Sequence, residues 1–203
     1  MPVGTKRSVM VNKLKTAGFL AMLILALPGW VMGAEVVSIW GGARETVVLK
    51  SDGTVWDWGA NDYGHLGDGS ISTATNRAND IHVPLEVHGP GNAGFLNSIV
   101  AIMGGEEHNV ALKSDGTVWA WGEGSLVNSI GDGTNVDRTS PVQVSNLSSV
   151  VSLGGRGYHS LAVKSDGTVW AWGFNAGGQL GNGTTAPTML PVQVIGLTNP
   201  VSV

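Results

Sequence analysis

One decapeptide occurs three times in this chain and constrains its fold more than any other feature. Residues 113–122 and 164–173 are identical (Lys-Ser-Asp-Gly-Thr-Val-Trp-Ala-Trp-Gly), and residues 50–59 differ only in Asp57, which replaces alanine. The Ser-Asp-Gly segments start at residues 51, 114 and 165, so they are 63 and 51 residues apart. A period near fifty residues indicates an array of similar modules.

Each copy predicts a β-hairpin, because Asp-Gly between alternating apolar residues is typical of a two-residue type I′ turn. Such a turn places Val163 opposite Trp170 and Leu161 opposite Trp172, which makes one face bulky and the other nearly bare. Apolar residues on both faces predict that both faces are buried. We therefore expect similar sheets packed face to face, with tryptophans against alanines of the adjoining sheet.

Each module contains two further strands around the hairpin. First strands are expected at 36–39, 99–102 and 150–153, and fourth strands, each beginning with proline, at 84–87, 141–144 and 191–194. We predict an all-β partial propeller of three four-stranded antiparallel blades plus the first strand of a fourth. The predicted repeats are 35–98, 99–149 and 150–199, with the start of a fourth at 200–203.

The first 34 residues have the pattern of a secretory signal peptide. Four basic residues and no acidic ones precede an apolar run at 19–27, and small residues follow, with Gly33 or Ala34 as the cleavage site. A membrane anchor is the alternative, but the run is shorter than the roughly 20 residues that span a bilayer. We expect a secreted, periplasmic or cell-envelope protein without a stable membrane anchor after cleavage.

Charge and cysteine content narrow the class of function. The chain has 11 basic and 15 acidic residues, and removal of the four basic residues of the signal leaves a net charge of −8. Such an acidic protein is a poor candidate for nucleic acid, whose phosphates need a basic surface. Cysteine is absent, so the core alone must hold the fold.

Residues 154–183 carry a family resemblance: Gly-Gly-x-x-x-His-Ser-Leu-Ala-Val-x-x-Asp-Gly-Thr-Val-Trp-Ala-Trp-Gly-x-Asn-x-x-Gly-Gln-Leu-Gly-x-Gly. This pattern resembles the repeat of the regulator of chromosome condensation family, and the likeness covers essentially the whole chain after the signal. The resemblance implies a seven-bladed propeller and an exported bacterial member. The family includes exchange factors for the GTPase Ran, accessory modules of ubiquitin ligases and kinases, and exported proteins that inhibit β-lactamases.

The repeats are irregular at a few positions. Glu45 stands where the other modules have His108 and His159, and 125–130 replaces the usual Asn-x-x-Gly-Gln-Leu segment. We place Asp57 on the small face of a first blade that has no preceding neighbour. Because three modules are too few for a ring, we expect a fragment; self-assembly of a complete chain into an oligomer is the alternative.

Residues that recur at repeat positions are expected to be structural. We interpret the histidines as hydrogen-bonding residues, the Asp-Gly pairs as turn residues rather than calcium ligands, and the tryptophans as core rather than a sugar-binding surface. Glu106-Glu107-His108 lacks the second histidine of a zinc-protease helix, and we expect no metal or cofactor. These positions are Asp52, Gly53, Trp56, Trp58, His108, Asp115, Gly116, Trp119, Trp121, His159, Asp166, Gly167, Trp170 and Trp172.

Two insertions in module one are the candidate binding loops, because loops on a rigid frame commonly carry function. They add 7 and 6 residues relative to module two and flank one strand, so they should emerge at opposite ends of the blade. Neutral drift of surface loops is the alternative. The candidate partner-binding residues are Arg77, Asn79, Asp80, His82, His88 and Phe95.

Together these observations favour a non-catalytic exported scaffold that binds a protein or glycan through propeller loops. An inhibitor of a secreted enzyme, similar to the β-lactamase-inhibiting propellers, is the second hypothesis. An enzyme would need clustered carboxylates at the inner strands, where only Glu45, Glu106 and Glu107 lie. Nucleotide exchange on a GTPase ranks last, because the signal predicts export.

Overall fold

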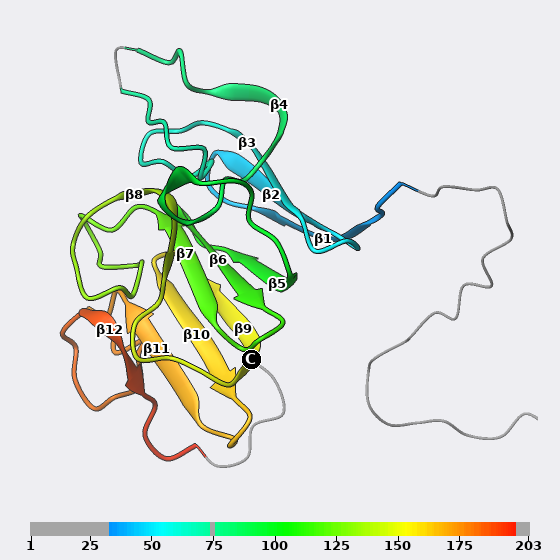
Figure 1. The fold of residues 1–203 in the computed structure, drawn as a ribbon. Coiled ribbons are helices and arrows are strands. Elements are labelled where there is room, and N and C mark those ends of the chain that lie inside the picture. The colour runs from blue at the N-terminus through cyan, green and yellow to red at the C-terminus, as the bar shows by residue number, and fades with distance from the viewer. Residues whose placement is uncertain (1–32, 74–75, 198–203) are drawn as a thin grey trace, which may run out of the picture. The chain divides into compact units, whose positions relative to one another are not determined.

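The computed structural model describes residues 33–73 and 76–197, and within them the chain forms three four-stranded antiparallel sheets (Figure 1). This confirms the predicted all-β partial propeller. Residues 1–32 of the predicted signal peptide (1–34) and the expected start of a fourth repeat at 200–203 lie outside the described residues. No described helix is long and apolar enough to cross a membrane.

Each sheet is one blade, and its strands follow one another in chain order. Blade 1 contains β1 (Val36–Gly41), β2 (Glu45–Lys50), β3 (Val55–Gly59) and β4 (Ile81–Glu86). Blade 2 contains β5 (Ile99–Gly104), β6 (His108–Lys113), β7 (Val118–Gly122) and β8 (Arg138–Gln143). Blade 3 contains β9 (Val150–Arg156), β10 (His159–Lys164), β11 (Val169–Gly173) and β12 (Thr188–Gln193). A short 3-10 helix, η1 (Pro90–Asn92), follows β4.

The hairpin register differs by one residue from the prediction. Trp170 lies opposite Ala162, and Trp172 lies opposite Ser160. The Lys164 N–H donates to the Thr168 carbonyl, and the Gly167 N–H donates to the Lys164 carbonyl, so the loop has three residues. Only the glycine of this loop has a positive φ, at 77°, which makes it a type I turn with a bulge rather than a type I′ turn.

The fourth strands also begin earlier than predicted, because each proline lies inside its strand. Pro84, Pro141 and Pro191 occupy the fourth position of β4, β8 and β12. These are the outermost strands of their sheets. An edge strand tolerates proline because the missing N–H can face away from the sheet.

The core lies between the blades rather than within one sheet. One buried cluster joins Val47 and Val55 of blade 1 to Ala111 and Trp121 of blade 2. The second joins blade 2, including Ala120, to Trp172 of blade 3. Trp121 and Trp172 are fully buried, whereas Trp170 is only partly buried. In blades 2 and 3 the second tryptophan of the hairpin is therefore the one that fills the interface with the preceding blade.

Backbone and indole hydrogen bonds repeat across both interfaces. The indole N–H groups of Trp121 and Trp172 donate to the carbonyls of His65 and Ser129 in the preceding blade, at 2.6 and 2.9 Å. The loop after the third strand also bonds the outermost strand of the next blade, through Gly69 to Thr139 and Gly133 to Met189. Both interfaces thus share these backbone and indole hydrogen bonds.

Candidate functional site

A polar pocket lies where blade 1 meets blade 2, and we call it the blade 1–2 pocket. Its volume is about 350 Å³. Blade 1 supplies most of the lining from the β1–β2 turn and the long β3–β4 connection, and blade 2 adds a residue from its β5–β6 turn. The lining residues are Arg44, Asp62, Tyr63, Ser72, Thr73, Arg77 and Glu107.

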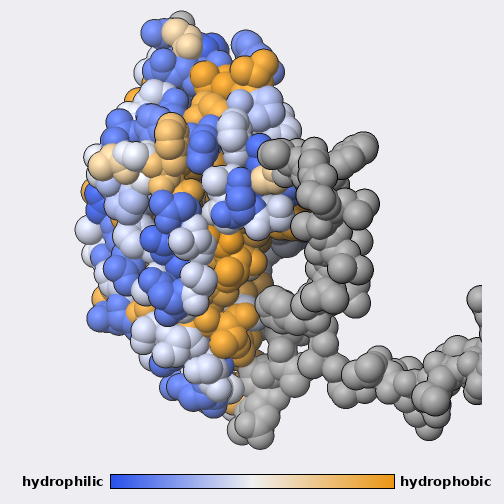
Figure 2. All heavy atoms as spheres, turned by 45° about the vertical axis from the view of Figure 1, so that its right-hand side comes forward, coloured by the Kyte–Doolittle hydropathy of each residue, from blue (hydrophilic) through white to orange (hydrophobic). Residues whose placement is uncertain are grey.

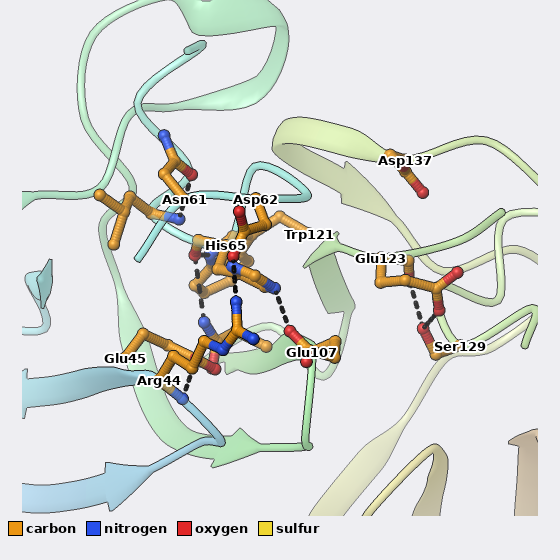
Figure 3. A network of polar contacts seen from close by, with 12 residues as sticks. Arg44, Glu45, Asn61, Asp62, His65, Glu107, Trp121, Glu123, Ser129 and Asp137 are labelled. Atoms are coloured by element: carbon orange, nitrogen blue, oxygen red, sulfur yellow. Dashed lines mark hydrogen bonds and ion pairs between the residues drawn. The ribbon is translucent and has the colours of Figure 1, made fainter. Parts of the chain in front are cut away.

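Two arginines meet on one carboxylate at the rim of this pocket. The Nη1 atoms of Arg44 and Arg77 lie 2.6 and 2.5 Å from the two oxygens of Asp62 (Figure 3 shows the Arg44 contact). Burial opposes the ionisation of Asp62, but the hydrogen bonds from Arg77 and Arg44 outweigh it and lower its pKa. Because the side chains of both arginines are about half exposed, their remaining N–H donors can reach a ligand.

A buried histidine lies next to Glu107, one of the residues that line the pocket. His65 is fully buried, and its Nε2 lies 2.8 Å from Glu107 Oε2, although the two groups are not aligned for a hydrogen bond. Burial alone would lower the pKa of His65, but Glu107 and Glu45 raise it by favouring the protonated ring. Burial raises the pKa of Glu45. His65 and Glu45 therefore lie behind Glu107, which is the one member of this group that lines the pocket.

Asp57 belongs to this buried cluster, and its predicted location was wrong. It is fully buried and accepts a hydrogen bond from Asn109 of blade 2 at 3.0 Å. Asp57 shares a face with Val47, which packs against blade 2, so it points toward the following blade and not toward an open end. Burial, followed by repulsion from Glu45, raises the pKa of Asp57 well above its usual range.

The second interface has a different polar pair. His108 Nε2 lies 2.8 Å from Ser160 Oγ of blade 3, and both residues are fully buried. Burial lowers the pKa of His108 to about 3, so the ring is neutral. A Ser–His pair resembles a nucleophile and its base. Here both groups are enclosed between sheets, where a substrate cannot reach them, and the contact connects two blades.

Comparison with known proteins assigns this geometry to a family. The model described as "Regulator of chromosome condensation (RCC1) repeat" matches residues 52–112 and 166–203, and a second model with the same description matches 99–126 and 151–179. The chain belongs to the RCC1 repeat family. This confirms the resemblance that the repeated motif indicated.

Curated relatives of the RCC1-repeat chain are much longer than the chain itself. The E3 ubiquitin-protein ligase HERC2 of Homo sapiens is 33% identical over 169 residues, which are 81% of this chain and 3% of that protein. The ultraviolet-B receptor UVR8 of Arabidopsis thaliana is 32% identical over 161 residues, 78% of this chain and 34% of the receptor. The chain therefore spans about a third of the receptor and a small part of the ligase.

Solved structures show the same fold. Prp20p of Saccharomyces cerevisiae matches with a TM-score of 0.65 and 22% identity over 79% of this chain and 38% of its own. Human WBSCR16 matches with a TM-score of 0.65 and 20% identity over 81% of this chain and 39% of its own. At these identities the likeness shows the RCC1-type propeller fold alone.

The first inserted loop of this RCC1-repeat protein contributes directly to the pocket. Arg77 lies at the rim, and Asp80 holds the loop by accepting from the Asn61 N–H at 3.1 Å. The Asn79 side chain donates to the Ile71 carbonyl within the loop at 2.7 Å. His82 is exposed on β4 and does not line the pocket.

The second inserted loop does not join the first. The register of β4 places Ile81 opposite Gly59 and Glu86 opposite Trp56, so the two loops leave this strand at opposite ends. His88 and Phe95 form an edge-to-face ring pair with centroids 5.6 Å apart, and Phe95 is exposed. Of the six candidate loop residues, only Arg77 lines the blade 1–2 pocket, and Asp80 lies 3.6 Å from its guanidinium group.

The repeated aspartates have a structural part in each hairpin. Oδ1 of Asp166 accepts from the N–H and the hydroxyl of Thr168, whose hydroxyl accepts from the Trp170 indole. The same contacts occur around Asp52 and Asp115. In the third blade, the Lys164 ammonium lies 5.6 Å from the Trp170 ring centre. These residues stabilise the turn that precedes the first tryptophan. His159, which is not part of this turn, is half-buried.

Several pocket residues were missed because they lie outside the repeated motif. Arg44, Asp62, Tyr63 and His65 are matched in blade 3 by residues of different chemistry, namely Tyr158, Ala176, Gly177 and Gln179. A position-by-position comparison of the modules could have singled them out. That comparison could not have shown that Arg77 reaches the same carboxylate.

Proposed function

We propose that this RCC1-repeat chain is a non-catalytic scaffold that binds a protein partner at the blade 1–2 pocket. The observation that carries the proposal is the pair of half-exposed arginines held in place by one carboxylate. Asp62 contacts both guanidinium groups, and Asp80 lies 3.6 Å from that of Arg77, so both groups are held in place. A preorganised arginine pair is suited to a carboxylate ligand, because the planar guanidinium matches it with two parallel hydrogen bonds.

The partner's contribution would be an acidic side chain or a chain terminus. Tyr63 lines the pocket beside the arginines and offers an aromatic ring with a hydroxyl, a combination common at protein interfaces. A protein is favoured over a glycan because the most buried tryptophans, Trp121 and Trp172, fill the blade interfaces and are not available to stack on sugars. Solved structures of the yeast relative concern its binding to Gsp1p and histones, and its complex with Kap60.

Site-specific photo-cross-linking tests this proposal. A photoreactive phenylalanine analogue at Tyr63 should capture a defined protein from an extract of the source cells. Arg77→Glu should abolish that cross-link, while Arg156→Glu, which changes an exposed arginine on blade 3, should not. Arg77→Ala should change the free energy of unfolding by less than about 0.5 kcal/mol, because exposed ion pairs contribute little. A cross-link that survives Arg77→Glu would contradict the proposal.

Export through residues 1–34 is a separate part of the proposal, supported by the basic start and the apolar run at 19–27. N-terminal sequencing of the protein from the cell exterior or envelope should find a chain that begins after Gly33 or Ala34. A protein recovered intact from the cytoplasm would refute export. If export holds, a secreted enzyme becomes a natural partner, and inhibition of a panel of β-lactamases by the purified chain tests that version.

A further inference from the structure

The lining of the blade 1–2 pocket carries no excess of positive charge. It contains two cationic side chains, those of Arg44 and Arg77, and two carboxylates, those of Asp62 and Glu107. Asp80 does not line the pocket, but it lies 3.6 Å from the Arg77 guanidinium and adds a further negative charge. A ligand that brings only a negative charge therefore gains little from the summed charge of the pocket. The positions of the individual groups must supply the recognition.

Hydrogen-bond donors and a free acceptor come to this pocket from different blades. Arg44 and Arg77 belong to blade 1, where both guanidinium groups contact Asp62. Glu107 comes from the β5–β6 turn of blade 2, and Figure 3 shows its contact with His65. One Glu107 oxygen lies 2.8 Å from the His65 ring, which leaves the other oxygen available to a ligand. The pocket thus offers guanidinium donors on one blade and a carboxylate acceptor on the other.

Ser72 supplies an independent observation that points to a ligand. This residue lines the pocket and is 3% exposed, and its hydroxyl has no hydrogen-bond partner among the described residues. Its backbone N–H donates to the Asn61 carbonyl at 2.7 Å, which fixes the chain at this position. Buried side-chain hydroxyl groups nearly always have a hydrogen-bond partner. An unpaired hydroxyl in the pocket wall therefore marks a place for a polar group of the ligand.

The pocket offers little to an apolar side chain. Among its described lining residues, Tyr63 is the only aromatic one, and none is an aliphatic hydrophobic residue. Exposed apolar residues gather elsewhere, because Figure 2 shows a hydrophobic stripe on the side of the molecule where β1, β5 and β9 lie. Val37, Val100 and Val151 of these strands are each more than half exposed, and none of them lines the pocket. The pocket is therefore suited to the polar groups of a main chain.

We propose that the blade 1–2 pocket binds the C-terminal residue of a partner polypeptide. The two arginines would bind the terminal carboxylate through charge-assisted hydrogen bonds. Glu107 would accept from the N–H of the same residue, and the Ser72 hydroxyl would donate to the carbonyl before it. An acidic side chain lacks an N–H on the carbon that bears its carboxylate, and an N-terminal amine would leave the arginines unused. This inference rests on the proposed function and narrows its ligand.

Peptide arrays provide the test. The full chain is applied to random-sequence hexapeptides that end in a free carboxylate and to the same sequences that end in a carboxamide. The free acids should bind about tenfold more tightly or better, because the amides lose the charge-assisted hydrogen bonds to the arginines. N-acetylglycine has the carboxylate, the N–H and the preceding carbonyl of a chain end. It should displace the peptides at concentrations where acetate and free glycine do not.

Variants separate a chain end from an acidic side chain. Glu107→Gln should weaken the binding of free-acid peptides about tenfold, because the N–H loses a charged acceptor. An anion alone would bind Glu107→Gln more tightly, because a negative charge has been removed from the lining. Ser72→Ala should weaken binding about threefold, because one neutral hydrogen bond is lost. Glu106→Gln changes the adjacent glutamate, which does not line this pocket, and is the matched control that should leave binding unchanged.

Three results would overturn the inference. The first is equal binding, or no binding, of the acid and amide peptides, a comparison that needs no variant and therefore stands even if Glu107→Gln unfolds the chain. The second is tighter binding to Glu107→Gln, which would assign the pocket to an anion alone. The third is stronger displacement by free glycine, which would assign it to a free amino acid. With any of these results, a Tyr63 cross-link that Arg77→Glu abolishes would still support the proposed function, so the two proposals can fail separately.

Discussion

Replacing Asp57 by alanine should stabilise this protein at neutral pH. Alanine is the residue that blades 2 and 3 carry at the same position, as Ala120 and Ala171. In blade 1 the carboxylate is fully buried, its Oδ1 has no hydrogen-bond partner, and its Oδ2 accepts one bond from Asn109. Glu45 and Asp68 add repulsion. A buried charge with so little compensation is destabilising.

The size of the effect follows from proton linkage. The raised pKa means that folded Asp57 keeps its proton at pH values where the unfolded chain has lost it. Folding therefore takes up a proton from the usual aspartate pKa, about 3.9, up to the raised pKa, and the free energy of unfolding falls by about 1.4 kcal/mol per pH unit in that window. At pH values below this window Asp57 is protonated in both the folded and the unfolded state, so its titration does not lower the free energy of unfolding. Alanine removes this dependence.

The Asp57→Ala substitution should also leave the Asn109 side-chain amide with a hydrogen-bond acceptor. Asn109 keeps its second acceptor, the His65 carbonyl at 3.2 Å, so its amide is not left without a partner. Exchanges of buried charges for apolar residues commonly range from neutral to a gain of about 1 to 4 kcal/mol. We expect Asp57→Ala to lie within this range near pH 7 and to be close to neutral near pH 4.

Urea unfolding followed by circular dichroism at several pH values measures this difference. Asp57→Asn is the matched control for charge, since it keeps the shape and should show the same loss of pH dependence. Asp115→Ala, at an exposed turn, is the control for the loss of any aspartate. A variant that is less stable than the wild type near pH 7, or a difference that does not change with pH, would refute the reasoning.

Two further predictions concern packing. Trp172→Ala should cost about 3 to 5 kcal/mol, because it empties a fully buried site and removes the hydrogen bond to Ser129, while Trp170→Ala should cost clearly less; equal urea midpoints would contradict the assigned faces. Gly105→Ala should cost about 1 to 3 kcal/mol, because the new Cβ would lie 2.2 Å from the His108 ring and 2.9 Å from the Gly157 carbonyl. Gly41→Ala is the control, because no atom lies within 4 Å of its new Cβ, and it should cost under about 0.5 kcal/mol. Thermal unfolding measures both variants, and equal losses of stability would contradict the close contact between residue 105 and His108.

The repeated decapeptide was sufficient to predict blades, because its turn, its alternation and its tryptophans act over short distances along the chain. It could not give the register, since Asp-Gly suits two turn types and the one-residue difference depends on the bulge at Gly167. The two tryptophans of each hairpin are also alike in sequence. Trp172 is buried and Trp170 only partly so because a neighbouring blade covers one of them.

The residues of the blade 1–2 pocket could be predicted from the sequence to a lesser degree than the blades. Arg77 was a candidate from loop length, but its partner Asp62 and the second arginine, Arg44, come from separate segments of the chain. Asp57 shows the same limit, because its charge is evident in the sequence whereas the face it occupies depends on strand pairing and on blade 2. Local periodicity determines which strands form. The contacts between residues far apart in the chain determine which of their side chains meet.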